Sequence, residues 1–295
     1  MTGKSYRGRI APSPTGFLHI GHAMTFWRAQ ERARAAAGNL ILRIEDLDVA
    51  RCREEFRKAA AEDLEWFGLR WEEGPDIGGA HAPYRQSERR TFYRDAWERL
   101  HAGGFIYPCR CSRKDVLASS FAPHDENEEP VYPGTCRPSG SATGISSTQE
   151  PGSSLSAKPS PETSDSHWRF QVPDGETLRF IDGRMGEQVA VAGKDFGDFV
   201  VWRRDNVPAY QLAVVVDDGA MDISEVVRGE DLLLSTFRQL LLYRALGLTP
   251  PEFYHTPLVT DDQGQRLAKR HAALSLRELR QSGVKAEEIR ARFAS

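Results

Sequence analysis

Two histidines separated by two residues stand near the start of the chain, in the run His19-Ile20-Gly21-His22. The run follows a turn-rich segment, so we expect it where a loop enters a helix. One helical turn brings both rings to the same side, and free N–H groups at the helix start favour phosphate. Gly21 leaves room for an adenine or a ribose to approach the backbone. The structural alternative is a helix start with two partly solvated histidines.

A short basic run lies far downstream, at Arg266-Leu267-Ala268-Lys269-Arg270, after a turn at residues 261–264. Three cations in five residues after a turn make a loop that can close over a polyphosphate. The alternative is a solvated basic loop. Taken together, the histidine pair and the basic run predict a site for a nucleoside triphosphate.

These two elements resemble the paired HIGH and KMSKS motifs of class I aminoacyl-tRNA synthetases. The first motif is intact at residues 19–22, whereas the second departs from the family pattern in its first three letters, residues 266–268. Lys269 matches the family's second lysine. The resemblance implies ATP with Mg²⁺ as a substrate and positioning plus electrostatic stabilisation as the catalytic principle. The implied catalytic and ATP-binding residues are His19, Gly21, His22 and Lys269, with His19, His22 and Lys269 as the catalytic groups.

Four further blocks look like the glutamate branch of that family: residues 9–16, 43–48, 210–218 and 227–231. Four blocks in the right order are far more specific than any one of them. The resemblance implies a glutamate-binding site composed of Arg9, Ile10, Ala11, Pro12, Ser13, Glu45, Tyr210 and Arg228.

Side-chain chemistry agrees with such a site. Free glutamate carries two carboxylates and one ammonium, so a selective pocket needs two cations, one anion and neutral donors. Arg9 and Arg228 supply the cations, Glu45 the anion, and Ser13 and Tyr210 the hydroxyls. Which arginine binds which carboxylate stays open, and the alternative for Glu45 is a salt bridge or cap at a strand end.

Three cysteines, Cys109, Cys111 and Cys136, lie close together in the sequence and suggest a tetrahedral zinc site more than a disulfide. His124 and Tyr132 compete as the fourth ligand. The spacing Cys-x-Cys followed by Tyr-x-x-x-Cys resembles a branch of the same family in which a tyrosine oxygen completes the site, which favours Tyr132. We expect one structural Zn²⁺ per chain, and an inert thiol at the isolated Cys52.

The elements that must position these residues alternate between strand and helix. We expect strands at residues 8–11 and 39–44 and helices at 22–37, 54–67 and 87–102. Strand-like runs at 199–203 and 209–216 precede a helix at 232–246. This alternation predicts the α/β class, a Rossmann-type parallel sheet that binds a nucleotide.

The predicted domain organisation has four parts. Residues 1–103 and 196–272 form the two halves of the catalytic domain, and residues 273–295 form short C-terminal helices. Between the halves, residues 104–195 form an inserted acceptor-binding-like subdomain with the zinc site. Within it, residues 138–166 are dense in Ser, Pro, Gly and Thr, so we expect them to be disordered.

Composition limits the partners. With 39 basic and 42 acidic side chains the net charge is -3, which excludes a broadly basic surface for nucleic acid and makes any RNA contact local. The sequence shows neither a membrane-spanning run nor a secretory signal, so we expect a cytoplasmic monomer without a membrane partner.

In its short length and its three cysteines, the chain resembles a branch of the family that lacks an anticodon-binding domain. The resemblance implies transfer of L-glutamate to queuosine at the wobble position of tRNA(Asp). Val214, where glutamyl-tRNA synthetases typically have an asparagine, is interpreted as a changed pocket or as one residue of a buried strand. The alternatives are a truncated glutamyl-tRNA synthetase that charges a 3′ end, and a non-catalytic zinc-containing RNA-binding paralogue.

Overall fold

The structure, a computed structural model, describes residues 5–118, 131–138, 160–162, 164–260 and 275–293. Strand β1 (Arg7–Ile10) pairs in parallel with β2 (Asn39–Leu42), and helix α1 (Ile20–Ala35) connects the two strands. Helix α2 (Glu54–Trp66) follows β2. The first strand–helix alternation is therefore confirmed, because short apolar runs pair as buried parallel strands and the periodic segments cover them.

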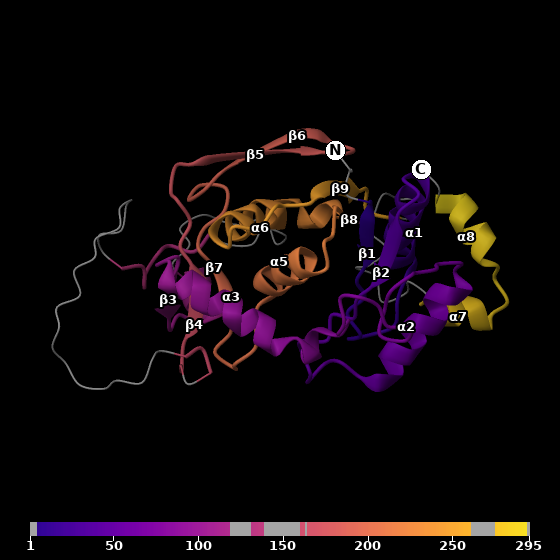
Figure 1. Cartoon of the computed structure of the whole chain (residues 1–295), viewed down its shortest axis with the longest axis horizontal. Helices are drawn as coiled ribbons and strands as arrows, with labels where there is room; N and C mark the ends of the chain where they lie inside the picture. Colours follow the sequence, from indigo (N-terminus) through magenta and orange to yellow (C-terminus); the bar gives the residue numbers. More distant parts are fainter. Residues whose placement is uncertain (1–4, 119–130, 139–159, 163, 261–274, 294–295) are drawn as a thin grey trace.

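The second half of the chain returns to lie beside this pair of strands. Strands β8 (Glu225–Gly229) and β9 (Glu252–Thr256) pair in parallel, and between them lie the short 3₁₀ helix η2 (Glu230–Leu232) and helix α6 (Leu233–Ala245). The backbone N–H of Ser224 donates to the carbonyl of Arg7 at 2.9 Å, which places β8 beside β1. A hairpin of β5 (Thr177–Asp182) and β6 (Gly186–Val191) extends from β9 along one edge (Figure 1).

The strand predicted at residues 209–216 is wrong, because this segment is helix α5 (Tyr210–Ala220). The helix packs against α6 and α3 and buries every residue from Leu212 to Asp218. A helix that is apolar on all sides shows no amphipathic period, so its β-branched run has the pattern of a buried strand. Val214 is therefore one residue of a buried helix, and it does not line the cavity described below.

A separate antiparallel sheet occupies one end of the molecule (Figure 1). It has the order β3-β4-β7, with β3 (Ile106–Cys109), β4 (His167–Phe170) and β7 (Phe199–Trp202). The 3₁₀ helix η1 (Gln86–Glu88) and helix α3 (Arg90–Ala102) lead into it, and the short helix α4 (Arg113–Ala118) follows β3. The sequence analysis did not separate β3, β4, β5, β6, β8 and β9 as strands.

Two short helices, α7 (Leu276–Gln281) and α8 (Ala286–Phe293), were expected after residue 273 and are present. A capping box between Ser275 and Glu278 starts α7, which satisfies free N–H groups of its first turn. Arg280 of α7 lies 3.3 Å from the buried carboxylate of Asp63 in α2, and this contact ties the C-terminal helices to the first strand–helix unit.

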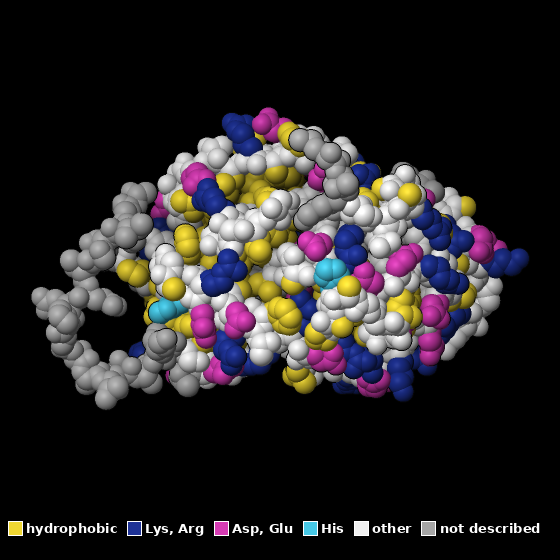
Figure 2. Space-filling model, viewed as in Figure 1, with side chains coloured by type: hydrophobic (Ala, Val, Ile, Leu, Met, Phe, Trp, Pro, Cys, Tyr) yellow, Lys and Arg dark blue, Asp and Glu magenta, His cyan; other side chains and the backbone are white. Residues whose placement is uncertain are grey.

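The surface shows no large area of one charge on the face drawn in Figure 2, where basic and acidic side chains alternate over the end that carries α1, α2 and α8. This distribution agrees with the near balance of charges in the sequence. Among the described residues, no helix combines the length and the apolar character that a membrane crossing requires. The basic run at 266–270 and most of the Ser/Pro-rich segment lie outside the described residues.

Candidate active site

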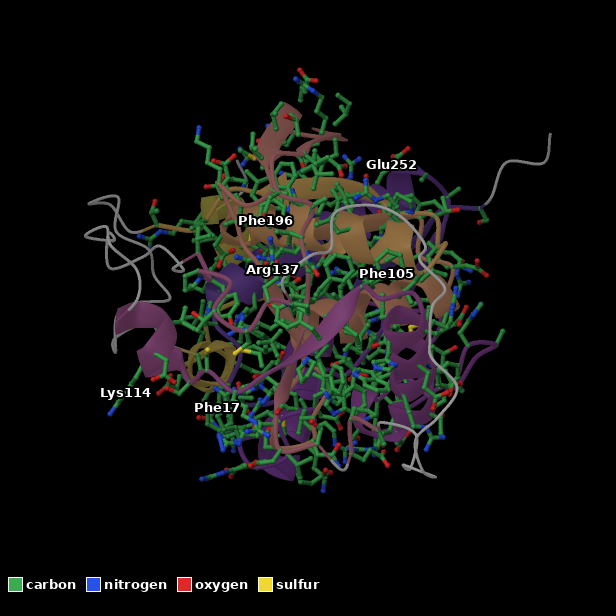
Figure 3. The ribbon with its side chains drawn as sticks, turned by 90° about the vertical axis from the view of Figure 1, so that its left-hand side faces the viewer. Phe17, Phe105, Lys114, Arg137, Phe196 and Glu252 are labelled. Carbon is green, nitrogen blue, oxygen red and sulfur yellow. The ribbon has the colours of Figure 1, made fainter. Side chains whose placement is uncertain are left out.

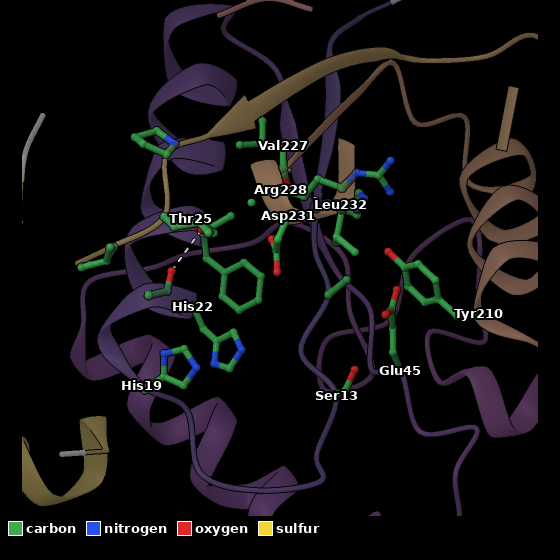
Figure 4. A pocket seen from close by; sticks show the side chains of 18 residues that line it. Ser13, His19, His22, Thr25, Glu45, Tyr210, Val227, Arg228, Asp231 and Leu232 are labelled. Atoms are coloured by element: carbon green, nitrogen blue, oxygen red, sulfur yellow. Dashed lines mark hydrogen bonds between the residues drawn. The ribbon is translucent and has the colours of Figure 1, made fainter. Parts of the chain in front are cut away.

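A cavity of about 380 Å³ lies beyond the carboxyl ends of β1 and β8, against the start of α1 (Figure 4). Ligands of parallel α/β sheets bind at this edge. The cavity brings together most of the residues predicted from the sequence: Arg9, Ala11, Ser13, His19, Gly21, His22, Glu45, Tyr210 and Arg228. Ile10 and Pro12 do not line it. The Ile10 side chain is buried in the core, and the Pro12 carbonyl accepts from the Glu45 backbone N–H at 3.0 Å. Lys269 lies outside the described residues.

The two histidines form one side of the cavity (Figure 4). His19 directly precedes α1 and His22 lies in its first turn, and their rings stack with centroids 3.7 Å apart. The prediction that both rings reach the same side is confirmed. A Cβ atom on Gly21 would come within 3.1 Å of the His19 ring, so a larger residue here would displace that ring by a few tenths of an ångström.

Ser13, Glu45 and Tyr210 lie across the cavity from the histidines (Figure 4). Glu45 receives a hydrogen bond from Arg43 at 3.0 Å. Burial raises the pKa of the Glu45 carboxyl, whereas the neighbouring cations Arg43 and Arg9 act in the opposite direction. This side of the cavity therefore offers an anion and two hydroxyls to a ligand.

Arg43 and Asp218 hold this arrangement from behind, and the sequence analysis gave neither of them a role. The guanidinium of Arg43 is completely buried and donates to Asp218 at 2.6 Å as well as to Glu45. Asp218 also lies 3.6 Å from the Nε atom of Arg9. Burial would lower the pKa of Arg43, but the carboxylates around it raise the pKa well above its ordinary value. Both residues lie in the motif blocks, but the sequence did not reveal their contacts with Glu45 and Arg9.

Arg228 is buried on β8 and is held by neutral groups. It donates to the Thr236 hydroxyl at 2.7 Å, to the Gln239 side-chain oxygen at 2.9 Å and to Nε2 of His255 at 3.2 Å. On its other side, His255 Nδ1 lies 2.7 Å from Asp182. A ring that donates through Nδ1 to Asp182 and accepts at Nε2 from Arg228 is a neutral imidazole in one defined tautomer.

This neutral ring predicts a pH dependence of stability. Burial and the cations Arg228 and Arg184 lower the pKa of His255 from 6.5 to about 4, although Asp182 acts in the opposite direction. As the pH falls from 6.5 towards 4, the unfolded chain binds a proton here that the folded protein excludes, so the free energy of unfolding falls. The full effect is on the order of 3 kcal/mol. In urea titrations His255→Gln should lose less stability than the wild type over this range, and an equal loss would contradict the assignment.

The cysteine cluster lies at the antiparallel sheet, where Cys109 is the last residue of β3, and Figure 3 labels Arg137, the residue after Cys136. The ligand atoms of Cys109, Cys111 and Cys136 all lie within 4.8 Å of one another. The Tyr132 hydroxyl lies 3.3 Å from the sulfur of Cys109 and 3.6 Å from that of Cys111. Arg169 donates to the Cys109 sulfur at 3.2 Å. The three cysteines could hold a metal ion, and the Tyr132 hydroxyl adjoins them, whereas His124 lies outside the described residues.

Comparison with known proteins places this site in a family. Residues 5–293 match the family model described as "tRNA synthetases class I (E and Q), catalytic domain". The chain belongs to this family. Membership in this family implies the α/β architecture of the class I synthetase catalytic domain, with mixed β-sheets.

Individual relatives of this synthetase carry two kinds of name. A "Glutamyl-Q tRNA(Asp) synthetase" of Symbiobacterium thermophilum is 48% identical over 96% of this chain and 83% of its own length. One of the same name from Nitratidesulfovibrio vulgaris is 46% identical with the same coverage. "Glutamate--tRNA ligase 2" of Acidithiobacillus ferrooxidans is 42% identical over 98% of this chain, which spans 57% of that ligase.

A solved structure supports the fold of the synthetase. A glutamate tRNA ligase from Elizabethkingia meningosepticum, crystallised in complex with its amino acid, superposes with a TM-score of 0.71 at 28% identity. The match covers 95% of this chain and 53% of the ligase. The synthetase therefore shares the fold of roughly half of that longer enzyme.

Proposed function

We propose that this synthetase activates L-glutamate with ATP and transfers it to queuosine at the wobble position of tRNA(Asp). The observation that carries the amino-acid part is the pairing of two buried arginines, Arg9 and Arg228, with Glu45 in one cavity that ends at the histidine pair. The RNA part is supported by the names of the relatives at 48% and 46% identity.

The cavity suits the first half-reaction. A carboxylate oxygen of glutamate attacks the α-phosphorus of ATP, the bond to the bridging oxygen breaks, and pyrophosphate leaves with its Mg²⁺. Negative charge on the phosphate oxygens is stabilised by His19, His22 and the N–H groups at the start of α1. Lys269 stays a prediction from the motif. The arginines and Glu45 hold the amino acid, so that the attack becomes a unimolecular step in a fixed geometry.

A second cavity of about 470 Å³ shares Ser13, Glu45 and Tyr210 with the first and provides a place for the acceptor nucleoside. Arg51 and Arg203 line it, which suits a local contact with RNA phosphate. In the second half-reaction a hydroxyl of the cyclopentene ring attacks the glutamyl carbonyl. The acyl–phosphate bond breaks, AMP leaves, and the hydroxyl proton passes to solvent or to the leaving phosphate.

Glutamate-dependent exchange of labelled pyrophosphate into ATP, measured without RNA, tests the activation step. We expect exchange with L-glutamate and none with D-glutamate, because Arg9, Arg228 and Glu45 fix three groups of the amino acid. Absence of exchange in folded protein would favour the non-catalytic paralogue. The glutamate–tRNA ligase relative supports the alternative of a truncated enzyme that charges a 3′ end. The RNA that accepts the glutamate distinguishes this alternative from the proposed function.

We further propose that the sheet β3-β4-β7, whose strands β3 and β4 come from the inserted residues 104–195, is held by one structural Zn²⁺ on Cys109, Cys111, Tyr132 and Cys136. The β5–β6 hairpin of the same range pairs with β9 instead and belongs to the sheet of the catalytic half. Four protein ligands leave no open position for a reacting water. Tetrahedral bonds of ~2.3 Å imply sulfur–sulfur separations of about 3.8 Å. The Cys111 and Cys136 sulfurs are 3.5 Å apart, so this pair lies near the separation that the ion requires.

Removing a zinc ligand should therefore destabilise the protein. We expect Cys109→Ser to lower the zinc content well below one ion per chain and to lower Tm by roughly 5–10 °C, because the free energy of metal binding contributes to folding. Cys52→Ser is the matched control, since Cys52 lies outside the cluster, and it should change neither quantity. Mass spectrometry measures the zinc content, and a thermal melt measures Tm. Wild-type protein that is purified without chelator and contains no zinc would contradict the proposed site.

A further inference from the structure

Arg228 differs from the other buried arginines of the site in the charge of its partners. Thr236, Gln239 and His255, which accept its hydrogen bonds, are all uncharged. In the part of the chain that the structure describes, no carboxylate oxygen lies within 4.0 Å of its guanidinium nitrogens. Because a buried cation without a counter-ion is costly, its charge is available to an anion that enters the cavity.

Arg43 shows the opposite arrangement at equal depth. Its guanidinium pairs with Glu45 at 3.0 Å and Asp218 at 2.6 Å, and Asp217 lies 3.8 Å away. Arg9 is intermediate, with one carboxylate at 3.6 Å. The fold thus neutralises Arg43 with carboxylates and supplies Arg228 with neutral acceptors only.

Further hydrogen bonds fix the orientation of these acceptors. The Gln239 amide nitrogen donates to the Gln211 side-chain oxygen at 2.9 Å, and the Gln211 amide nitrogen donates to the Ser235 hydroxyl at 3.0 Å. This chain turns the Gln239 oxygen towards Arg228. Asp182 performs the same task for His255 by holding its Nδ1 atom at 2.7 Å, which leaves Nε2 as an acceptor.

We propose that Thr236, Gln239 and His255 determine specificity, because together they make Arg228 select a carboxylate over a carboxamide and thereby distinguish L-glutamate from L-glutamine. The inference rests on the proposed function. A guanidinium has five N–H groups, so the three hydrogen bonds to these residues leave donors for the Tyr210 hydroxyl and for the ligand. With neutral acceptors, a ligand carboxylate meets the full positive charge. A carboxamide offers no charge and brings N–H groups that face the guanidinium donors.

The substitution Gln239→Glu tests the proposal, because it keeps the shape of the side chain and adds one negative charge beside Arg228. We expect the KM for L-glutamate in pyrophosphate exchange to rise about tenfold to a hundredfold, with the KM for ATP unchanged. The ratio of the inhibition constant of L-glutamine to the KM for L-glutamate should fall at least about tenfold.

Two variants serve as controls. Gln239→Met removes the acceptor without adding charge, so the ratio should stay within roughly threefold of the wild type. Gln281→Glu makes the same change at an exposed position on α7 and should change none of these constants. If Gln239→Glu and Gln239→Met lower the ratio equally, or if Gln239→Glu keeps the wild-type ratio, the proposal is overturned. Lack of glutamate-dependent exchange in the wild type would instead refute the proposed function.

Discussion

Replacing Arg228 by methionine is expected to lower kcat/KM for L-glutamate in pyrophosphate exchange by about a thousandfold. The guanidinium is buried and fixed by three neutral acceptors, so its charge is directed at the ligand. Losing one member of a buried, hydrogen-bonded charge pair costs roughly 2–5 kcal/mol, which corresponds to such a factor. The KM for ATP should stay near the wild-type value, because the histidines lie on the other side of the cavity (Figure 4).

The Arg228→Met variant should also keep its fold. A buried cation without a carboxylate partner contributes little to stability, so Tm is expected to fall by no more than a few degrees. Arg228→Lys keeps the charge but loses the planar fork, and it should give an intermediate rate. A methionine variant that melts normally and still uses glutamate at the wild-type rate would exclude Arg228 from the amino-acid site.

Replacing Arg43 by methionine is expected to have the opposite profile, a large loss of stability. Arg43 is completely buried, and its removal leaves Glu45 and Asp218 buried without their shared cation. Breaking a buried ion pair from one side costs about 3–5 kcal/mol of unfolding free energy. Chemical denaturation measures this loss, and the KM for glutamate should rise as well, because Arg43 positions Glu45 through the bond at 3.0 Å.

The matched control is Arg179→Met, because Arg179 pairs with Glu187 at 3.2 Å while both side chains are more than half exposed. Pairs of this kind contribute about 0–1 kcal/mol, so the control should unfold within about 1 kcal/mol of the wild type. Equal losses for Arg43→Met and Arg179→Met would show that the network around Arg43 does not stabilise the fold.

The site residues themselves could be predicted from the sequence, whereas their partners could not. Arg9, Glu45, Tyr210 and Arg228 were predicted from motif blocks and residue chemistry, and all four line one cavity. The histidine pair was placed correctly at a helix start, because the turn before it and the period after it are local signals.

The partners of Arg228 could not be predicted in the same way. His255 lies on β9, and Thr236 and Gln239 lie on α6, so they meet Arg228 only after both elements pack against β8. No local pattern marks a glutamine or a histidine that will accept from a distant guanidinium. Asp182, which fixes the His255 ring, lies on β5, a strand that the sequence analysis did not separate.

The secondary structure of α5 was predicted wrongly for a related reason. Its apolar residues are buried on every side by elements that lie far away in the sequence, so the run from Leu212 to Val216 carries no helical period. The position of Tyr210 at the start of this helix places its hydroxyl in the cavity, and the motif identified that residue although the predicted secondary structure was wrong.

Transfer of labelled glutamate to three RNAs tests the central claim most directly. The protein is incubated with ATP, Mg²⁺ and labelled L-glutamate, together with queuosine-containing tRNA(Asp), the same tRNA with unmodified guanosine, or tRNA(Glu). Label on the queuosine-containing tRNA(Asp) alone is the predicted result, because the second cavity adjoins Glu45 and Tyr210 and is proposed to receive the wobble nucleoside. Label on tRNA(Glu), or equal label on both forms of tRNA(Asp), would contradict it.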